Sequence, residues 1–202
     1  MKWFKVLTVW IGLVAASPSG ASTILVYGDS LSAAYGIDLE QGWVSLVSQA
    51  LGPKYTLVNA SISGETSSGG LNRLPHTLDE MQPDLVLLEL GANDGLRGGS
   101  IPNLQRNLQA MIELLQARNI QTVLIGIGVP PSYGPRYVDE FRAVFPALAD
   151  DYGLPLLDFY REEFFLKPNF IQADGLHPTA TAQPVIADLV LDFLRSESLI
   201  SP

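Results

Sequence analysis

The stretch Ile24-Leu25-Val26-Tyr27-Gly28-Asp29-Ser30 decides the fold of this 202-residue chain. Four apolar residues end abruptly in a glycine and two polar residues. A short, continuous apolar run of this kind is typical of a parallel strand that is covered on both faces, with a turn at its carboxyl end. Four later segments have the same form, so the first expectation is a parallel sheet.

Helical patterns alternate with these apolar runs along the chain. The expected strands are Thr23–Tyr27, Thr56–Asn59, Leu85–Leu90, Thr122–Ile127 and Leu154–Asp158. The expected helices are Gly42–Leu51, Thr66–Met81 with an interruption at Pro75, Asn103–Arg118, Tyr137–Tyr152 and Ala180–Leu194. Regular alternation of strand and helix predicts a doubly wound α/β sandwich, with helices on both faces of a five-stranded parallel sheet. No linker interrupts it, so residues 22–202 are expected to form one domain.

Composition narrows the classes of partner. The chain is 47% hydrophobic and 16% charged, carries a formal net charge of −9 and has no cysteine. An acidic chain lacks the basic face that a nucleic-acid partner needs, so no such partner is expected. The lack of cysteine means that no disulfide can form, and a core must stabilise the fold.

The first 21 residues have the layout of a secretory signal. Lys2 and Lys5 precede a nearly continuous apolar run, Val6–Ala16, and small residues follow Ser17-Pro18. The alternative, a membrane anchor, would need a longer apolar run of about 20 residues. We expect cleavage after residue 21, which changes the formal side-chain charge from −9 to −11 by removing two lysines. The mature protein would have no membrane span and would reside in the periplasm of a Gram-negative host.

A serine, a histidine and an aspartate form the candidate catalytic set. Ligands of doubly wound sheets bind beyond the carboxyl ends of the strands, where Ser30 lies. A serine hydroxyl needs a base to become a nucleophile, and the chain has only two histidines. His177 has a carboxylate, Asp174, three residues before it, whereas His76 has no comparable setting. We therefore expect Ser30 as nucleophile, His177 as base and Asp174 as the group that orients the base.

Three groups are candidates for stabilising an oxyanion. The backbone N–H of Ser30, the N–H of Gly64 and the side-chain amide of Asn93 follow three successive strands. Each segment alone has a structural explanation as an ordinary turn or helix entry. Their common position at strand ends, together with one suitable histidine, favours the catalytic interpretation. Asp29 and Asp94 are expected to hold their loops by hydrogen bonds.

The chain resembles the SGNH hydrolases, also called the GDSL esterase/lipase family. The resemblance rests on four blocks, Gly28-Asp29-Ser30-Leu31-Ser32, Gly64, Gly91-x-Asn93-Asp94 and Asp174-x-x-His177, and extends from about residue 23 to residue 195. It implies a flavodoxin-like three-layer sandwich, a triad of Ser30, Asp174 and His177, and an oxyanion hole of Ser30, Gly64 and Asn93. Segments 59–66 and 89–98 are most similar to the branch of periplasmic thioesterase I/lysophospholipases and arylesterases.

This resemblance implies hydrolysis of carboxylic esters and thioesters through an acyl-enzyme. Lysophospholipids, aryl esters and acyl thioesters are the expected substrates, and the acidic charge disfavours steering of polyanionic acyl-CoA. Eight apolar residues near strand ends are candidates for an acyl groove: Leu74, Leu78, Pro130, Pro131, Tyr133, Phe164, Phe165 and Ile171. Neither a metal nor another cofactor is expected, because the chain has no cysteine and two histidines without ligand spacing.

Three alternatives remain open at this point. A carbohydrate O-deacetylase could use the same catalytic set, and so could a peptidase-like enzyme that acts on activated esters. A non-catalytic periplasmic binding protein could retain the fold, but binding alone does not require a serine, a histidine and an aspartate in this pattern. A monomer is expected.

Overall fold

The computed structural model of the protein describes residues 21–159 and 167–201. Five parallel strands form one sheet in the order β2-β1-β3-β4-β5. They are β1 (Ser22–Gly28), β2 (Tyr55–Asn59), β3 (Leu85–Glu89), β4 (Gln121–Gly126) and β5 (Leu156–Asp158). This order is the flavodoxin-like one, so the predicted fold class is confirmed. The predicted signal segment lies outside the described residues except for Ala21.

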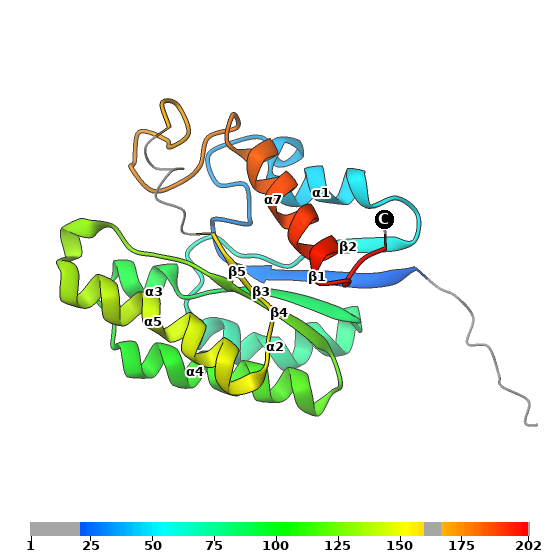
Figure 1. Cartoon of the computed structure of the whole chain (residues 1–202), viewed down its shortest axis with the longest axis horizontal. Coiled ribbons are helices and arrows are strands. Elements are labelled where there is room, and N and C mark those ends of the chain that lie inside the picture. Colours follow the sequence, from blue (N-terminus) through cyan, green and yellow to red (C-terminus); the bar gives the residue numbers. More distant parts are fainter. Residues whose placement is uncertain (1–20, 160–166, 202) are drawn as a thin grey trace, which may run out of the picture.

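Helices cover both faces of the sheet. They are α1 (Trp43–Leu51), α2 (Ser67–Met81), α3 (Ala92–Leu96), α4 (Ile101–Ala117), α5 (Pro135–Tyr152) and α7 (Gln183–Ser196), with short 3-10 turns at Leu39–Gln41 and Pro131–Tyr133. Figure 1 shows α1 and α7 together on one face and α2, α4 and α5 on the other. Among the described residues, no helix combines the length and apolarity needed to cross a bilayer.

The three inner strands form the centre of the core. Every residue of β3 is buried, as are residues 24–28 of β1 and residues 122–126 of β4. The expectation that all five strands are fully covered is wrong for β2 and β5, which lie at the sheet edges and have half-buried and exposed positions. An edge strand has a neighbour on one side only, so the helix layers do not close over it.

Helix α2 differs from its expected form. Pro75 lies within it, yet the helix runs unbroken from Ser67 to Met81. The predicted interruption is therefore wrong. Proline removes one backbone donor and its ring crowds the preceding turn. Pro75 is on the exposed side of the helix, where its ring has room.

The sheet order places the functional segments at one edge. The chain reverses its direction of winding between β1 and β3, and such a switch point opens a crevice at the carboxyl ends of the two strands. Asp29 and Ser30 follow β1 there, and Asn93 follows β3. The segment before α7 returns to the same edge, where Ile171 and Pro178 form an isolated antiparallel bridge.

Candidate active site

Ser30, His177 and Asp174 form a continuous hydrogen-bonded set. The Ser30 Oγ lies 2.9 Å from His177 Nε2, and His177 Nδ1 lies 2.7 Å from Asp174 Oδ2. A carboxylate can only accept a hydrogen bond from Nδ1, so Nδ1 carries the proton and Nε2 is left as the acceptor for the serine hydroxyl. This is the tautomer that a histidine needs in order to act as a base toward serine.

The loop around Asp174 explains its spacing of three residues from His177. Asp174 Oδ1 accepts the backbone N–H groups of Leu176 (2.9 Å) and His177 (3.1 Å), while Oδ2 meets the His177 ring. Gly175, between them, has φ +73°, a conformation that favours glycine. Partial burial raises the pKa of Asp174, but the hydrogen bonds from Leu176 and His177 outweigh it and lower the pKa below its ordinary value. Asp174 is therefore held as an anion beside the imidazole.

A turn directly after β1 presents Ser30. The Asp29 carbonyl accepts the N–H groups of Ser32 (3.3 Å) and Ala33 (3.0 Å), and its carboxylate accepts the N–H of Leu31 at 3.1 Å. Gly28 precedes this turn because the space beside it is filled. A Cβ atom at Gly28 would lie 2.5 Å from Glu89 Oε2, which is far inside normal contact distance.

Gln172 joins the loop that carries the serine to the loop that carries the histidine. Its side-chain amide donates to the carbonyls of Tyr35 (2.8 Å) and Pro178 (2.9 Å), and its backbone N–H donates to the His177 carbonyl at 2.8 Å. The Tyr35 ring packs on the His177 imidazole with a centroid distance of 4.4 Å. Sequence reasoning missed both residues, because a glutamine and a tyrosine in loops carry no motif that points to an active site.

Two of the expected oxyanion donors have free N–H groups. The backbone N–H groups of Ser30 and Gly64 have no hydrogen-bond partner within residues 21–159 and 167–201. Gly64 has φ +82° and is exposed, and its carbonyl accepts a hydrogen bond from Arg97 at 3.1 Å. An unpaired, accessible N–H is what an oxyanion requires.

Asn93, the third expected donor, has its amide already bonded. Its Nδ2 donates to Asp29 Oδ2 at 3.1 Å and to the Glu65 carbonyl at 2.9 Å. Both neighbours are acceptors, so the nitrogen rather than the oxygen of the amide must face them. A bound oxyanion has to take over or share one of these two hydrogens. The neutral Glu65 carbonyl is the weaker acceptor of the two, because hydrogen bonds to ionised groups are about twice as strong.

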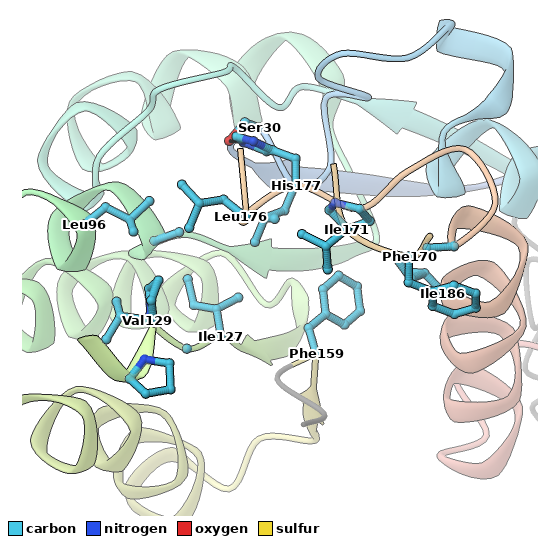
Figure 2. Close-up of a pocket in the computed structure, with 18 of the residues that line it drawn as sticks. Ser30, Leu96, Ile127, Val129, Phe159, Phe170, Ile171, Leu176, His177 and Ile186 are labelled. Carbon is cyan, nitrogen blue, oxygen red and sulfur yellow. Dashed lines mark hydrogen bonds between the residues drawn. The ribbon is translucent and has the colours of Figure 1, made fainter. Parts of the chain in front are cut away.

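An apolar pocket of about 290 Å³ opens beside Ser30 and His177. Figure 2 shows Ser30 at one end of it and Val129 and Phe159 at the other. Its apolar wall includes Leu96, Ile127, Val129, Phe159, Phe170, Leu176 and Ile186. The wall is built from segments that follow β3, β4 and β5 together with the start of α7. A pocket with so few polar groups beyond its mouth suits a hydrocarbon chain.

The structure corrects part of the expected acyl groove. Pro130, Pro131 and Ile171 lie in the pocket wall. Leu74 and Leu78 do not: they are 0% and 2% exposed and belong to the core. They lie on the face of α2 that packs against the sheet. Their position near a strand end in the sequence does not show which face of the helix they occupy.

Tyr133 also lies outside the wall of this pocket. Its hydroxyl donates to the Leu96 carbonyl at 2.6 Å, and its ring stacks on Tyr137. The predicted groove residues Phe164 and Phe165 lie outside the described residues. Sequence reasoning missed Ile127 and Phe159. Ile127 was expected inside a strand, but β4 ends at Gly126. Phe159 follows the expected fifth strand, so the rule that led to Ser30 would have found it.

The remaining polar residues have structural contacts. Asp94 accepts the backbone N–H of Ser67 at 2.8 Å and its hydroxyl at 2.6 Å, so its side chain holds the start of α2. His76 is exposed on α2 and lies 3.3 Å from Glu80. Within the described part of the chain, no group of three His, Asp or Glu side chains is arranged to hold a metal ion.

Comparison with known proteins places this geometry in a family. The model of the GDSL-like lipase/acylhydrolase family matches residues 26–183. The chain belongs to this family. A GDSL hydrolase acts on ester bonds, so the protein is a serine hydrolase of ester bonds.

Individual relatives match most of the chain. Esterase TesA of Pseudomonas aeruginosa is 46% identical over 180 residues, which cover 88% of this chain and 90% of that protein. The thioesterase 1/protease 1/lysophospholipase L1 of Escherichia coli is 43% identical over 180 residues, which cover 89% of this chain and 86% of that protein. The crystal structure of the psychrotrophic esterase EstA from a Pseudoalteromonas species, inhibited by monoethylphosphonate, has a TM-score of 0.82 and 44% identity, covering 87% and 97%. This GDSL hydrolase thus shares its fold with a solved esterase and matches these relatives over most of their length.

Proposed function

We propose that this GDSL hydrolase cleaves esters and thioesters of acyl chains, among them lysophospholipids and aryl esters, through an acyl-enzyme on Ser30. The observation that carries the proposal is the apolar pocket that begins at the Ser30–His177 pair. A nucleophile at the mouth of such a pocket attacks the carbonyl of an acyl group whose chain lies inside it.

The Ser30–His177–Asp174 geometry supports a two-step reaction. His177 Nε2 takes the hydroxyl proton of Ser30 while Oγ attacks the substrate carbonyl, and Asp174 stabilises the imidazolium that forms. The same proton then passes to the leaving alcohol or thiol, which departs and leaves the acyl group on Ser30. Water, deprotonated by His177, attacks the acyl-enzyme and releases the acid.

Three donors surround the developing oxyanion in this mechanism. The free N–H groups of Ser30 and Gly64 are available without rearrangement. The Asn93 amide contributes the hydrogen that faces the Glu65 carbonyl in the absence of substrate. Gly64 and Glu65 are neighbours in the chain, so this hydrogen lies on the side of the amide that faces the Gly64 segment. The Asn93 amide would then exchange its hydrogen bond to the Glu65 carbonyl for one to the oxyanion. Because the oxyanion forms only in the transition state, this exchange stabilises the transition state more than the bound ester.

The size and charge of the site favour neutral or zwitterionic substrates with one acyl chain. A volume of about 290 Å³ is at the small end of ligand pockets, which suits a single short to medium chain. The formal side-chain charge of −11 after loss of residues 1–21 repels polyanionic thioesters such as acyl-CoA at a distance.

A substrate panel tests this proposal. Residues 22–202 are assayed with nitrophenyl esters of graded chain length, lysophosphatidylcholine, acyl-CoA and acetylated xylan. We expect turnover of the nitrophenyl esters and lysophosphatidylcholine, with acyl-CoA slower at low ionic strength. Strong preference for acetylated xylan would instead show a carbohydrate O-deacetylase, and no turnover of any ester would leave only a binding function.

Export of a monomer is part of the proposal. Ser22 pairs with Tyr55 at the start of the sheet and its N–H donates to the Lys54 carbonyl, so cleavage after residue 21 leaves every strand intact. N-terminal sequencing of protein from the periplasmic fraction of a Gram-negative host should give a chain that begins near Ser22. Recovery of an intact Met1 in membranes would contradict this, and light scattering tests the monomer.

A further inference from the structure

Two carboxyl groups lie buried side by side behind the proposed oxyanion hole. Asp29 and Glu89 are each 0% exposed, and Gly28, next to Asp29, is opposite Glu89 in the β1–β3 register. Glu89 Oε2 accepts the Asp29 N–H at 3.2 Å and the Ser32 hydroxyl at 2.8 Å. Glu89 Oε1 is buried and has no partner within the described residues, and neither carboxyl forms an ion pair there.

One proton must stay on this pair. Burial of a carboxylate without a cation is costly, and a second carboxylate beside it raises the cost further. Burial raises the pKa of Asp29 to about 6, with smaller effects from the Leu31 N–H, Asn93, His177 and Asp94. Burial, followed by the charge of Asp29, raises the pKa of Glu89 well above its usual range. The contacts assign that proton to Glu89: the Asp29 carboxylate accepts the Leu31 N–H and one Asn93 hydrogen, which favour its anion, whereas Glu89 Oε1 has no donor within the described residues.

The anion is in direct contact with the proposed oxyanion donor. Asp29 Oδ2 accepts one hydrogen of the Asn93 amide, and that bond fixes the plane in which the second hydrogen points. Asp29 in turn is fixed by its backbone N–H on Glu89. A chain of contacts thus runs from Glu89 through Asp29 and Asn93 to the substrate oxygen, although Glu89 touches no substrate.

We propose that Glu89 is a positioning residue for ester hydrolysis: as a neutral acid it holds the Asp29–Ser32 turn from behind and leaves Asp29 as the anion that orients the Asn93 amide. This inference rests on the proposed role of Asn93 as an oxyanion donor. It differs from a merely structural role for Glu89 in two respects. The amide of glutamine should replace the acid, and the effect of losing Glu89 should depend on Asn93.

Single variants test the first point, with kcat and KM measured on a short nitrophenyl ester. Glu89→Gln keeps the shape and the neutral state, so kcat should stay within about threefold of wild type. Glu89→Ala leaves the Asp29 N–H and the Ser32 hydroxyl without an acceptor. Its kcat should fall about 10-fold to 100-fold with little change in KM, less than the loss of a donor itself. Glu40→Ala, at an exposed position, serves as the control and should be unchanged.

A double-mutant cycle with Asn93→Ala tests the second point. In the Asn93→Ala background, Glu89→Ala should lower kcat less than about twofold, because the group through which it acts is gone. If Glu89→Ala does not fold, Asp29→Asn replaces it: it removes the anion, should lower kcat about as much, and should show the same dependence on Asn93.

Two results would contradict the role of Glu89, and a third would contradict the role of Asn93. Equal losses from Glu89→Ala or Asp29→Asn in both backgrounds would show that the effect does not pass through Asn93. A Glu89→Gln variant as impaired as Glu89→Ala would show that the ionised form is needed. Either result overturns the role of Glu89. Wild-type kcat in Asn93→Ala alone would instead overturn the proposed oxyanion role of Asn93, a separate outcome.

Discussion

At the scale of the residue, the site depends on which hydrogens are already bonded before a substrate arrives. The Ser30 hydroxyl has His177 as its acceptor at 2.9 Å, and His177 has Asp174 at 2.7 Å. Asn93 has two acceptors of unequal strength. Each contact sets the direction of a later proton transfer or hydrogen bond, so single substitutions should separate their roles.

The two histidines provide a matched pair. His177→Ala removes the base and should lower kcat by several orders of magnitude, since a triad without its histidine retains little more than its oxyanion and binding contributions. His76→Ala changes an exposed side chain on α2 and should keep nearly all activity. Ser30→Ala should be as inactive as His177→Ala and should not react with a serine-directed phosphonate. Substantial turnover by Ser30→Ala would exclude the acyl-enzyme.

Asn93 separates an oxyanion donor from a loop-shaping residue. Asn93→Ala should lower kcat about 10²–10³-fold with a much smaller effect on KM, because the bond strengthens in the transition state. Asn93→Asp should be at least as damaging, since it adds a negative charge beside Asp29 and the oxyanion. If Asn93 only shapes its loop, the melting temperature should fall while the folded fraction turns over normally.

At the scale of the element, the ends of neighbouring strands pack at different distances from the side chains beside them. Two glycines at strand ends show this difference. Gly28 ends β1 and Gly126 ends β4, and neither has a positive φ. A Cβ at Gly28 would lie 2.5 Å from Glu89 Oε2, whereas one at Gly126 would have only ordinary contacts of 3.5 Å or more. Gly28→Ala should therefore destabilise the protein by about 1–3 kcal/mol and lower kcat, and Gly126→Ala by less than about 1 kcal/mol. Urea denaturation of both variants measures this, and equal losses would contradict the close packing at Gly28.

Two leucines test where the acyl chain lies. Leu176 is in the wall of the pocket, and Leu78 is in the core under α2. Leu176→Ala should lower kcat/KM for medium-chain esters about tenfold more than for acetate, because it removes about 1–2 kcal/mol of apolar contact with the chain. Leu78→Ala should cost about 2–5 kcal/mol of stability and leave the chain-length preference unchanged. The reverse pattern would place the acyl chain elsewhere.

Sequence reasoning reached the elements and the motifs but not the side-chain directions. The apolar run before Gly28 was enough to place β1, because a buried parallel strand has few alternative forms. Ser30, Asp174 and His177 could be named because their chemistry requires those residue types. Leu74 and Leu78 were placed wrongly in the groove, since closeness to a strand end does not show which face of the helix a residue occupies. The pairing of Asp29 with Glu89 was missed because it needs the β1–β3 register.

At the scale of the whole molecule, the protonation of the buried Glu89 should make the free energy of unfolding depend on pH. Glu89 has a raised pKa in the folded protein, so protonation stabilises the fold fully below the unfolded value of 4.5 and this stabilisation is lost as the pH rises. As the pH rises above about 4.5, the wild type should lose stability relative to Glu89→Gln by up to ~1.4 kcal/mol per pH unit, because the unfolded chain then releases the proton that the folded protein keeps. Urea denaturation across this range measures the difference. A difference that does not change with pH would show that Glu89 is ionised in the fold; Glu40→Gln, at an exposed position, is the control substitution.

The distance along the chain between Ser30 and His177 has a consequence for biogenesis. Ser30 follows the first strand, and His177 lies in the loop before the last helix, 147 residues later. A growing chain that contains Ser30 but not yet His177 has no base for the serine hydroxyl, so we expect it to hydrolyse no ester. Hydrolytic activity is therefore expected only once nearly the whole chain has been made. A nascent chain arrested before Asp174 should leave a serine-directed phosphonate unreacted.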